Sequence, residues 1–366
     1  MPAVLPVQSS LAGVRVLVSG ANGFIALHVV KTLLEQGYIV RGTVRSEEKG
    51  RRLEERFREV YGSKFEWIVV EDIAKDGAFD DAVRDVDAIQ HVASPAGVNE
   101  TGDQSPDVYI KPAVQGTLGI LRSALKFGHN VKRIILTSST AAIWRLNVTE
   151  SEAPVTFDET NWCDDSLAEV RERGSKAPML AKYSASKALS EKAAWEFYHD
   201  HQKEVGWDLV ALLPAMVPLT DTKSISGLPD SLGWWFRSIF QEQPDAILGL
   251  GFGYVDVVDC AAALVAALQK DNVGGERIII SAGPTTFQDT RNLILSSLKL
   301  SLPASALTII RGNPSLETKP LYTYNAEKGK RLLELEYREP VETYRELVNW
   351  VLEKGWLNGA ENDSGM

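Results

Sequence analysis

Short apolar runs alternate with helical patterns through the first three-quarters of the chain. Strands are predicted at VRVLVS (14–19), FEWIVV (65–70), AIQHVA (88–93), RIILTS (133–138), DLVALL (208–213) and RIIIS (277–281). Most of these runs are apolar throughout, which is typical of parallel strands covered on both faces. The stretch FIALHVVKTLLEQ has a helical period and ends at Gly37, a C-terminal cap. Repeated strand–helix units predict an α/β fold with a doubly wound parallel sheet.

Two parts of the chain break this pattern. Residues 146–180 hold no clear strand and are acidic, so we expect a solvated loop there. Residues 218–251 and 284–358 are richer in proline, tryptophan and irregular spacing, and are expected to form a smaller C-terminal substrate lobe. The expected Rossmann-type domain covers 11–217 and regains 252–283. The ends, 1–10 and 359–366, are expected to be flexible tails.

Composition excludes several classes of protein. The chain has 366 residues, of which 44% are hydrophobic, enough for a large core. Its net charge of -10 argues against attraction to nucleic acid or to an anionic membrane. Cys163 and Cys260 are far apart, which predicts two free thiols in a reducing compartment and no metal site. Without a secretory signal or a long apolar run, a cytoplasmic protein with no nucleic-acid or membrane partner is expected.

A glycine-rich turn follows the first predicted strand. In VSGANGFIA, Gly20, Gly23 and Ala26 have the spacing G-x-x-G-x-x-A. The first glycine permits a tight turn, the second lets the backbone approach a pyrophosphate, and the small third residue lets helix and strand pack closely. The helix then points its N-terminal amides at the phosphates. The turn predicts dinucleotide binding; an ordinary strand–helix turn is the alternative.

The next strand, YIVRGTV at 38–44, is followed by Arg45. An NAD-selective site usually has a carboxylate here to bind the ribose 2′-hydroxyl, but none lies between Glu35 and Glu47. Arg45, with Lys49 one helical turn further on, suits a 2′-phosphate instead. Solvated surface cations are the alternative.

Asp72 and Ile73 follow the strand at 65–70. In a dinucleotide site they would face the adenine amino group and ring. Asp72 is also a candidate helix cap, so both interpretations stay open.

Three residues further along suggest carbonyl chemistry. Tyr183 and Lys187, in YSASK, are four residues apart and share one face of a helix predicted at 181–198. A neighbouring ammonium lowers the pKa of a tyrosine, which makes it a better proton donor and base near neutral pH. LTSST ends a strand, where ligands bind in open sheets, and Ser139 is predicted to polarise the substrate carbonyl. Ser138 is the alternative, and a simple strand-end cap is another.

These motifs together resemble the extended short-chain dehydrogenase/reductases. Within them the likeness is to the dihydroflavonol-reductase-like branch, especially fungal NADPH-dependent aldehyde and ketone reductases of the methylglyoxal/isovaleraldehyde reductase and Sporobolomyces carbonyl reductase type. The likeness covers about residues 12–355 and rests on VSGANGFIA, RGTVRS, VVEDI, HVASP, LTSST, YSASK with EKAAWEF, and GYVDVVD.

The resemblance implies a triad of Ser139, Tyr183 and Lys187. The expected contacts with NADP(H) are Gly20, Asn22, Gly23, Phe24, Ile25, Arg45, Lys49, Asp72, Ile73, Ala93, Ser94, Pro95, Thr137, Tyr183, Lys187, Pro214 and Val217. The chain departs from the family pattern at Gln115, where asparagine is usual, around Pro218, where a glycine–proline pair is missing, and at Val258, where arginine is common. None of these positions belongs to the triad.

The function expected is NADPH-dependent reduction of aldehydes or ketones to alcohols by hydride transfer. Tyr183 would donate the proton, Ser139 would position the oxygen, and Lys187 would tune Tyr183 and bind the ribose. A nucleotide-sugar epimerase or dehydratase on the same scaffold, or a non-catalytic NADP-sensing protein, are the alternatives. The partner expected is a small-molecule carbonyl substrate, and the chain is expected to be a monomer or homodimer.

Three adjacent aromatic residues, Trp234, Trp235 and Phe236, lie in the expected lobe. They cannot all face one way on a helix, so at least one should face away from the lobe's own core. One of them would then cover the substrate beside Tyr183. The alternative is that they form the lobe core or a subunit contact.

Overall fold

The computed structural model of this chain describes residues 13–94, 104–146, 148, 154–218, 230–298, 302 and 304–357. Its strands are β1 (Arg15–Val18), β2 (Ile39–Val44), β3 (Phe65–Val69), β4 (Ala88–His91), β5 (Arg133–Thr137), β6 (Val155–Phe157), β7 (Asp208–Pro214), β8 (Gly251–Tyr254), β9 (Arg277–Ile280), β10 (Gly283–Thr286) and β11 (Tyr322–Tyr324). Its helices are α1 (Phe24–Glu35), α2 (Glu47–Tyr61), α3 (Asp107–Phe127), α4 (Asp164–Arg173), α5 (Met179–Asp200), α6 (Asp230–Phe240), α7 (Asp245–Leu248), α8 (Val257–Gln269), α9 (Phe287–Leu298), α10 (Ala304–Arg311), α11 (Glu327–Leu333) and α12 (Pro340–Glu353).

A seven-stranded sheet forms the centre of the fold. Its order is β3-β2-β1-β4-β5-β7-β9, and each neighbouring pair of strands is parallel. Every strand predicted from an apolar run is present in it, so the doubly wound Rossmann-type sheet is confirmed. Because the strands are parallel, all their carboxyl ends meet at one edge of the sheet, where ligands bind in such folds.

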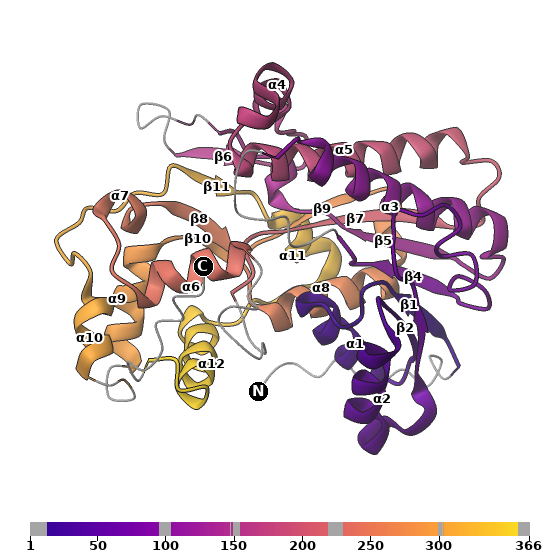
Figure 1. Ribbon diagram of the computed structural model, residues 1–366, viewed down its shortest axis with the longest axis horizontal. Coiled ribbons are helices and arrows are strands. Elements are labelled where there is room, and N and C mark those ends of the chain that lie inside the picture. The colour runs from indigo at the N-terminus through magenta and orange to yellow at the C-terminus, as the bar shows by residue number, and fades with distance from the viewer. Residues whose placement is uncertain are drawn as a thin grey trace.

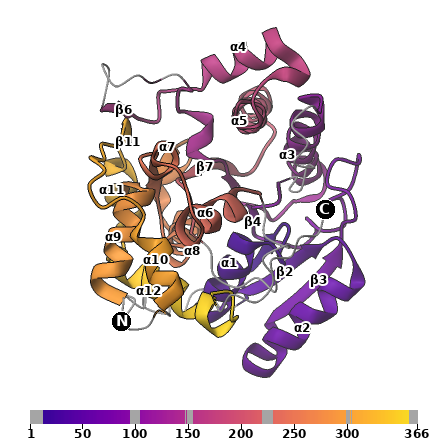
Figure 2. The ribbon, with the colours of Figure 1, turned by 60° about the vertical axis from the view of Figure 1, so that its left-hand side comes forward.

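Helices cover both faces of this sheet (Figures 1 and 2). On one face α1 packs beside α8, and their apolar side chains join those of β1, β2, β7 and β9 in one core cluster. On the other face α3 lies along α5 over a second cluster. Each strand is therefore buried on both sides, which explains why its sequence is continuously apolar rather than alternating.

The ends of α1 follow from local chemistry. Gly23 is its N-cap, and no side chain of the described residues caps the helix there. At the other end Gly37 has φ +95°, a left-handed conformation that favours glycine. The predicted end of this helix at Gly37 is thus confirmed. The N-terminal amides of α1 lie at the sheet edge without a side-chain cap among the described residues.

The later part of the chain builds a smaller lobe on the left of Figure 1. β8 and β10 form an antiparallel pair, and α6, α9, α10 and α12 contribute to a separate apolar cluster. Of the segment predicted to return to the sheet domain, α8 and β9 pack there, whereas Gly251–Tyr254 and Gly283 pair within the lobe. The exact division into two domains stays a prediction.

The acidic segment differs from the solvated loop that its charge predicts. Residues 155–157 form β6, which pairs in parallel with β11, more than 160 positions later. α4 follows, and the loop between them contacts the edge strand β9. Local charge could not reveal this, because the strand has three residues and its partner lies far along the chain.

Within the described residues, no helix has both the length and the apolar character that crossing a membrane requires. Cys163 and Cys260 are both free and buried.

Candidate functional site

The glycine turn lies between β1 and α1 at the carboxyl edge of the sheet. Gly20 has φ +65°, and a Cβ there would lie 3.1 Å from the Cβ of Ala93. A Cβ on Gly23 would lie 3.0 Å from the carbonyl oxygen of Gly20. The turn therefore needs glycine at the first position, for conformation as well as for space. Asn22 is exposed and Phe24 and Ile25 are half-buried, so all three border the open end of α1.

Two polar side chains that sequence reasoning missed hold this turn. The hydroxyl of Thr43 accepts from the backbone N–H of Gly20 at 3.0 Å. Ser19 Oγ accepts from the N–H groups of Val92 and Ala93, at 3.0 and 2.9 Å. The turn is thereby fixed to the neighbouring strands β2 and β4. Polar residues within apolar strands are the only sequence signal for them.

His91 completes this support. Its Nδ1 lies 3.0 Å from Ser19 Oγ, whose acceptor capacity is already used, so Ser19 donates and Nδ1 accepts. Burial, followed by the nearby charge of Lys187, lowers the pKa of His91 to about 3. The imidazole is therefore neutral and serves as a fixed acceptor for Ser19, next to the glycine turn.

Arg45 and Lys49 lie at the end of β2 and in the first turn of α2. Both are exposed, and neither is paired with another side chain in the part of the chain that the structure describes. The acidic residues beside them are engaged within α2: Glu47 pairs with Arg51, and Glu48 with Arg52. The two cations thus remain available to an anion at this edge of the sheet.

Asp72 and Ile73 follow β3. Asp72 is exposed, and its Oδ1 accepts from the N–H of Ala74 at 2.9 Å, so it does cap a turn. Ile73 packs against α3, where a Cβ on Gly116 would meet its side chain at 2.9 Å. The two interpretations of Asp72 are compatible, since one carboxylate oxygen is left for a ligand.

Ala93 and Ser94 follow β4 and are half-buried at the same edge. Ala93 faces Gly20 across the turn. Pro95, also expected in the site, lies outside the described residues.

The end of β5 carries three hydroxyl groups with different partners. Thr137 Oγ1 is buried and has no hydrogen-bond partner among the described residues. Ser138 Oγ donates to the carboxylate of Glu191 at 2.5 Å. Ser139 is half-buried, and its Oγ accepts from the N–H of Ala141 at 3.1 Å, which leaves its own hydrogen free. Of the two candidate serines, Ser139 is the one with a hydroxyl hydrogen to offer a substrate.

Tyr183 and Lys187 both lie on α5, one turn apart. Alanine, leucine, lysine and glutamate make this stretch strongly helical, and small buried residues let it approach α3 closely. Tyr183 is 39% exposed, whereas Lys187 is buried. Next to Tyr183, Ser184 accepts a hydrogen bond from Trp144 Nε1 at 2.8 Å, which fixes this turn of the helix. The tyrosine is therefore partly open to solvent, whereas the lysine four residues further along the same helix is not.

Pro214 ends β7, and Val217 follows it in a buried backbone segment. The N–H of Met216 donates to the carbonyl of Gly253 in β8 at 3.0 Å, and its carbonyl accepts from the N–H of Val255, directly after β8, at 2.9 Å. This segment therefore joins the sheet to the lobe at the edge where the other candidate residues lie.

The three aromatic residues of α6 differ in burial. Trp235 is 0% exposed and stacks on Tyr344 in the lobe core, and Phe236 is buried there too. Trp234 is half-buried, with its ring edge on Phe287 at a centroid distance of 4.8 Å. All three side chains therefore pack in or against the lobe core, as the alternative interpretation predicts. Trp234 keeps part of its surface exposed, and its contact with a substrate stays a prediction.

Known proteins resemble the chain over almost its whole length. NADPH-dependent methylglyoxal reductase GRE2 of Saccharomyces cerevisiae is 35% identical over 348 residues, covering 92% of this chain and 98% of that protein. Aldehyde reductase 2 of Sporidiobolus salmonicolor is 34% identical over 310 residues, covering 82% and 84%. The crystal structure of yeast methylglyoxal/isovaleraldehyde reductase Gre2 complexed with NADPH matches with a TM-score of 0.79 and 30% identity over 94% of this chain and 99% of the other.

More distant structures share the fold alone. UDP-glucuronic acid 4-epimerase from Bacillus cereus matches with a TM-score of 0.63 at 18% identity, covering 93% of this chain and 99% of that one. The family model described as "NAD dependent epimerase/dehydratase family" matches residues 16–283. The resemblance predicted from the motifs is therefore confirmed, and the chain belongs to the NAD dependent epimerase/dehydratase family.

Proposed function

We propose that this protein is an NADPH-dependent carbonyl reductase that reduces small aldehydes and ketones to alcohols. The observation that carries the proposal is the placement of Ser139, Tyr183 and Lys187 at the same sheet edge as the glycine turn. Its relatives are named methylglyoxal reductase, ketoreductase and aldehyde reductase, which supports the same reaction class.

The residues present fit a dinucleotide. The left-handed Gly20 and the N-terminus of α1, which lacks both a side-chain cap and an acidic residue in its first turn, suit a pyrophosphate. The buried Thr137 hydroxyl, without a partner among the described residues, is a further group that a cofactor would satisfy. Arg45 and Lys49 would bind the 2′-phosphate, which favours NADP(H) over NAD(H).

When bound, NADPH supplies the hydride that adds to the carbonyl carbon. Ser139 donates a hydrogen bond to the carbonyl oxygen and so stabilises the negative charge that develops there. Tyr183 delivers its phenolic proton to that oxygen, giving the alcohol. Lys187 would stabilise the resulting phenolate and would hold the nicotinamide ribose of the bound cofactor.

Two other functions are less well supported. A nucleotide-sugar epimerase of this fold would favour a carboxylate after β2, where this chain has Arg45. A cofactor-sensing protein without activity would have no need of both Tyr183 and Lys187. We further propose a cytoplasmic protein that is a monomer or homodimer; its free cysteines support a reducing compartment.

The test is the substitution Tyr183→Phe, measured as NADPH oxidation across a panel of aldehydes and ketones. The ring still packs and only the hydroxyl is lost, so kcat is expected to fall about 10²–10⁴-fold while NADPH binding persists. Tyr198→Phe, on the same helix but stacked on Trp207, is the matched control and should keep parental kcat. Full activity of Tyr183→Phe would exclude the role given to Tyr183.

A further inference from the structure

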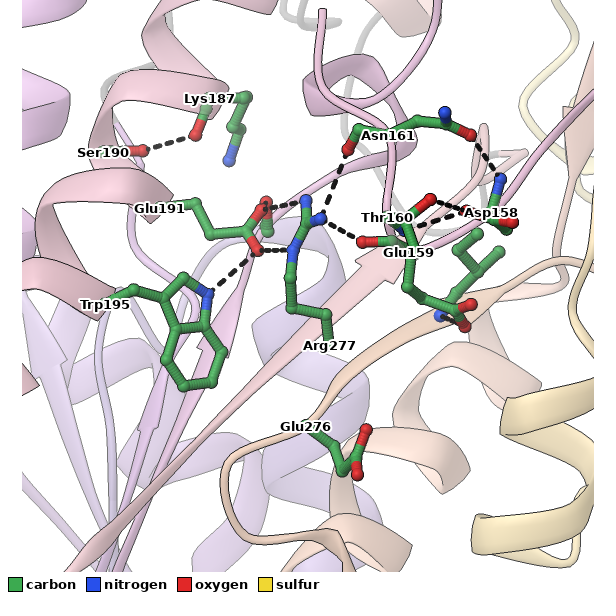
Figure 3. Close-up of polar contacts among 12 residues, drawn as sticks. Asp158, Glu159, Thr160, Asn161, Lys187, Ser190, Glu191, Trp195, Glu276 and Arg277 are labelled. Carbon is green, nitrogen blue, oxygen red and sulfur yellow. Dashed lines mark hydrogen bonds and ion pairs between the residues drawn. The ribbon is translucent and has the colours of Figure 1, made fainter. Parts of the chain in front are cut away.

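A buried carboxylate lies on α5 one helical turn beyond Lys187. Glu191 is 0% exposed, and its two oxygens accept from Ser138 Oγ at 2.5 Å, from Arg277 Nε at 2.6 Å and from Trp195 Nε1 at 3.2 Å. Figure 3 shows the contacts of Glu191 with Arg277 and Trp195. Three donors from three parts of the chain therefore meet at one side chain. None of the roles given above to the triad or the cofactor site uses it.

One of these contacts, the hydrogen bond from Ser138, joins the two elements that carry the proposed triad. Ser138 directly precedes Ser139 at the end of β5, and Glu191 shares α5 with Tyr183 and Lys187. The backbone N–H of Ser138 also donates to Leu212 of β7 at 2.8 Å. The strand end is thus held from the sheet side by β7 and from the helix side by Glu191.

Arg277 holds the carboxylate from its other side. This residue begins the edge strand β9, and its guanidinium donates to the backbone carbonyls of Glu159 and Asn161 and lies over the ring of Trp162 at 3.7 Å. Glu159 in turn accepts from the N–H of Ile279 at 3.1 Å. Figure 3 shows this chain of contacts running from α5 to the loop after β6. Glu191 is therefore fixed rather than free to change rotamer.

Stability alone does not account for a buried ion pair. Removing two charges from water is expensive, and well-packed apolar residues often serve a core equally well. What such a pair supplies is directional hydrogen bonding, which defines how two elements sit against each other. Catalysis depends strongly on that geometry, because a misplacement of about 1 Å can cost about 10²-fold in rate.

We propose that Glu191 is a positioning residue, which sets the distance and orientation between Ser139 and the Tyr183–Lys187 pair by fastening α5 to the end of β5 through Ser138. The inference rests on the proposed function, because it assigns Glu191 a role in that same site. Glu191 acts through Ser138, and neither side chain need touch the substrate.

The experiment is a double-mutant cycle on the full-length protein. Ser138→Ala removes the hydroxyl and leaves the Glu191–Arg277 pair, Glu191→Gln removes the charge with little change of shape, and the third variant carries both. The matched control is Asp208→Asn. Asp208 pairs with Arg133 Nε at 2.6 Å, the same distance as in the Glu191–Arg277 pair, but at the amino ends of β5 and β7. Thermal unfolding, NADPH affinity, kcat and KM are measured for each.

We expect Ser138→Ala and Glu191→Gln each to lower kcat about 10- to 100-fold, with NADPH affinity changed less than about threefold. The double variant should lose no more than the worse single variant, because both remove one connection. Asp208→Asn should lose thermal stability and keep parental kcat when assayed well below its melting temperature.

Several results would overturn the inference. Parental kcat in Glu191→Gln would do so, as would a double variant whose loss is the product of the two single losses. A kcat loss in Asp208→Asn equal to that of Glu191→Gln would show a general effect of stability. A large loss in Ser138→Ala with little in Glu191→Gln would place Ser138 itself at the substrate. Each of these leaves the Tyr183→Phe result unaffected, so the proposed function stands or falls separately.

Discussion

Single residues can decide which cofactor a dinucleotide site accepts, and we propose that Arg45 does so here. Its guanidinium is exposed at the end of β2, and its acidic neighbours on α2 are engaged with other arginines. Arg45→Asp places a repulsive charge opposite the 2′-phosphate. Since a charge-assisted hydrogen bond contributes roughly 1.5–3 kcal/mol, NADPH affinity should fall tenfold or more. Fluorescence titration with NADPH and NADH measures the affinity of the variant for each cofactor.

NADH is the internal control for this substitution. It lacks the 2′-phosphate, so its affinity should change much less. Arg51→Asp, in α2, supplies a control for surface charge, because Arg51 is already paired with Glu47. A parental protein that uses NADH as well as NADPH would contradict the role of Arg45 and Lys49.

His91 makes a second prediction at the residue scale. Its pKa is lowered to about 3 in the folded protein, from an ordinary value of 6.5, chiefly by burial. Between these values the unfolded chain binds a proton that the folded protein does not, so this contribution to stability is lost as pH falls below 6.5. His91→Asn keeps an acceptor for Ser19 and cannot titrate. The melting temperature of His91→Asn minus that of the parent should therefore be more favourable to the variant at pH 4.5 than at pH 7.5.

A relative melting temperature that is the same at both pH values would contradict the neutral, buried state of His91. Because the comparison is between parent and variant at each pH, the titration of other groups cancels to first order.

At the scale of elements, α6 places adjacent tryptophans in different surroundings. Trp235 is fully buried against Tyr344, so Trp235→Ala should lower the free energy of unfolding by about 3–5 kcal/mol without reordering substrate preference. Trp234 is half-buried, so Trp234→Ala should cost less stability and change the ratio of kcat/KM for bulky and small carbonyls. Chemical denaturation measures the free energy of unfolding of each variant, and the carbonyl panel measures its substrate preference.

An unchanged substrate ranking in Trp234→Ala, with stability loss alone, would leave this residue with a packing role only. NADPH affinity should be parental in both variants, since neither residue belongs to the predicted cofactor contacts.

Elements with strong local signals were predictable from the sequence, and those made by distant pairing were not. The apolar runs predicted the parallel sheet, because burial on both faces leaves a continuous pattern. β6 was not predicted, because its three residues lie in an acidic stretch and pair with β11 far along the chain. Gly20 and Gly23 could be predicted because the turn itself requires glycine at this spacing. The partnership of Glu191 with Arg277 spans 86 positions and has no local signature.

At the scale of the whole molecule, the lobe and the sheet domain are joined by a charged cluster. Asp256 and Asp259 lie at the start of α8, and Arg338 reaches them from the segment before α12. Arg338 also pairs with Glu346 of α12. The cluster ties α12, which packs in the lobe, to α8, which packs on the sheet domain.

The same cluster makes stability depend on pH. Asp259 is buried, and burial raises its pKa to about 7; Asp256 and Glu342 add to the rise, while Arg338 opposes it. Between the ordinary value of 3.8 and about 7 the folded protein holds a proton that the unfolded chain has released, so this contribution to stability falls as pH rises. In this structure the backbone N–H of Arg338 donates to Asp259 Oδ2 at 2.9 Å. Asp259→Asn keeps an acceptor for that N–H but removes the charge. The melting temperature of Asp259→Asn should therefore match that of the parent near pH 4 and exceed it at pH 8.5. If the difference between the two melting temperatures is constant with pH, Asp259 is ionised in the folded protein throughout, which would contradict the prediction.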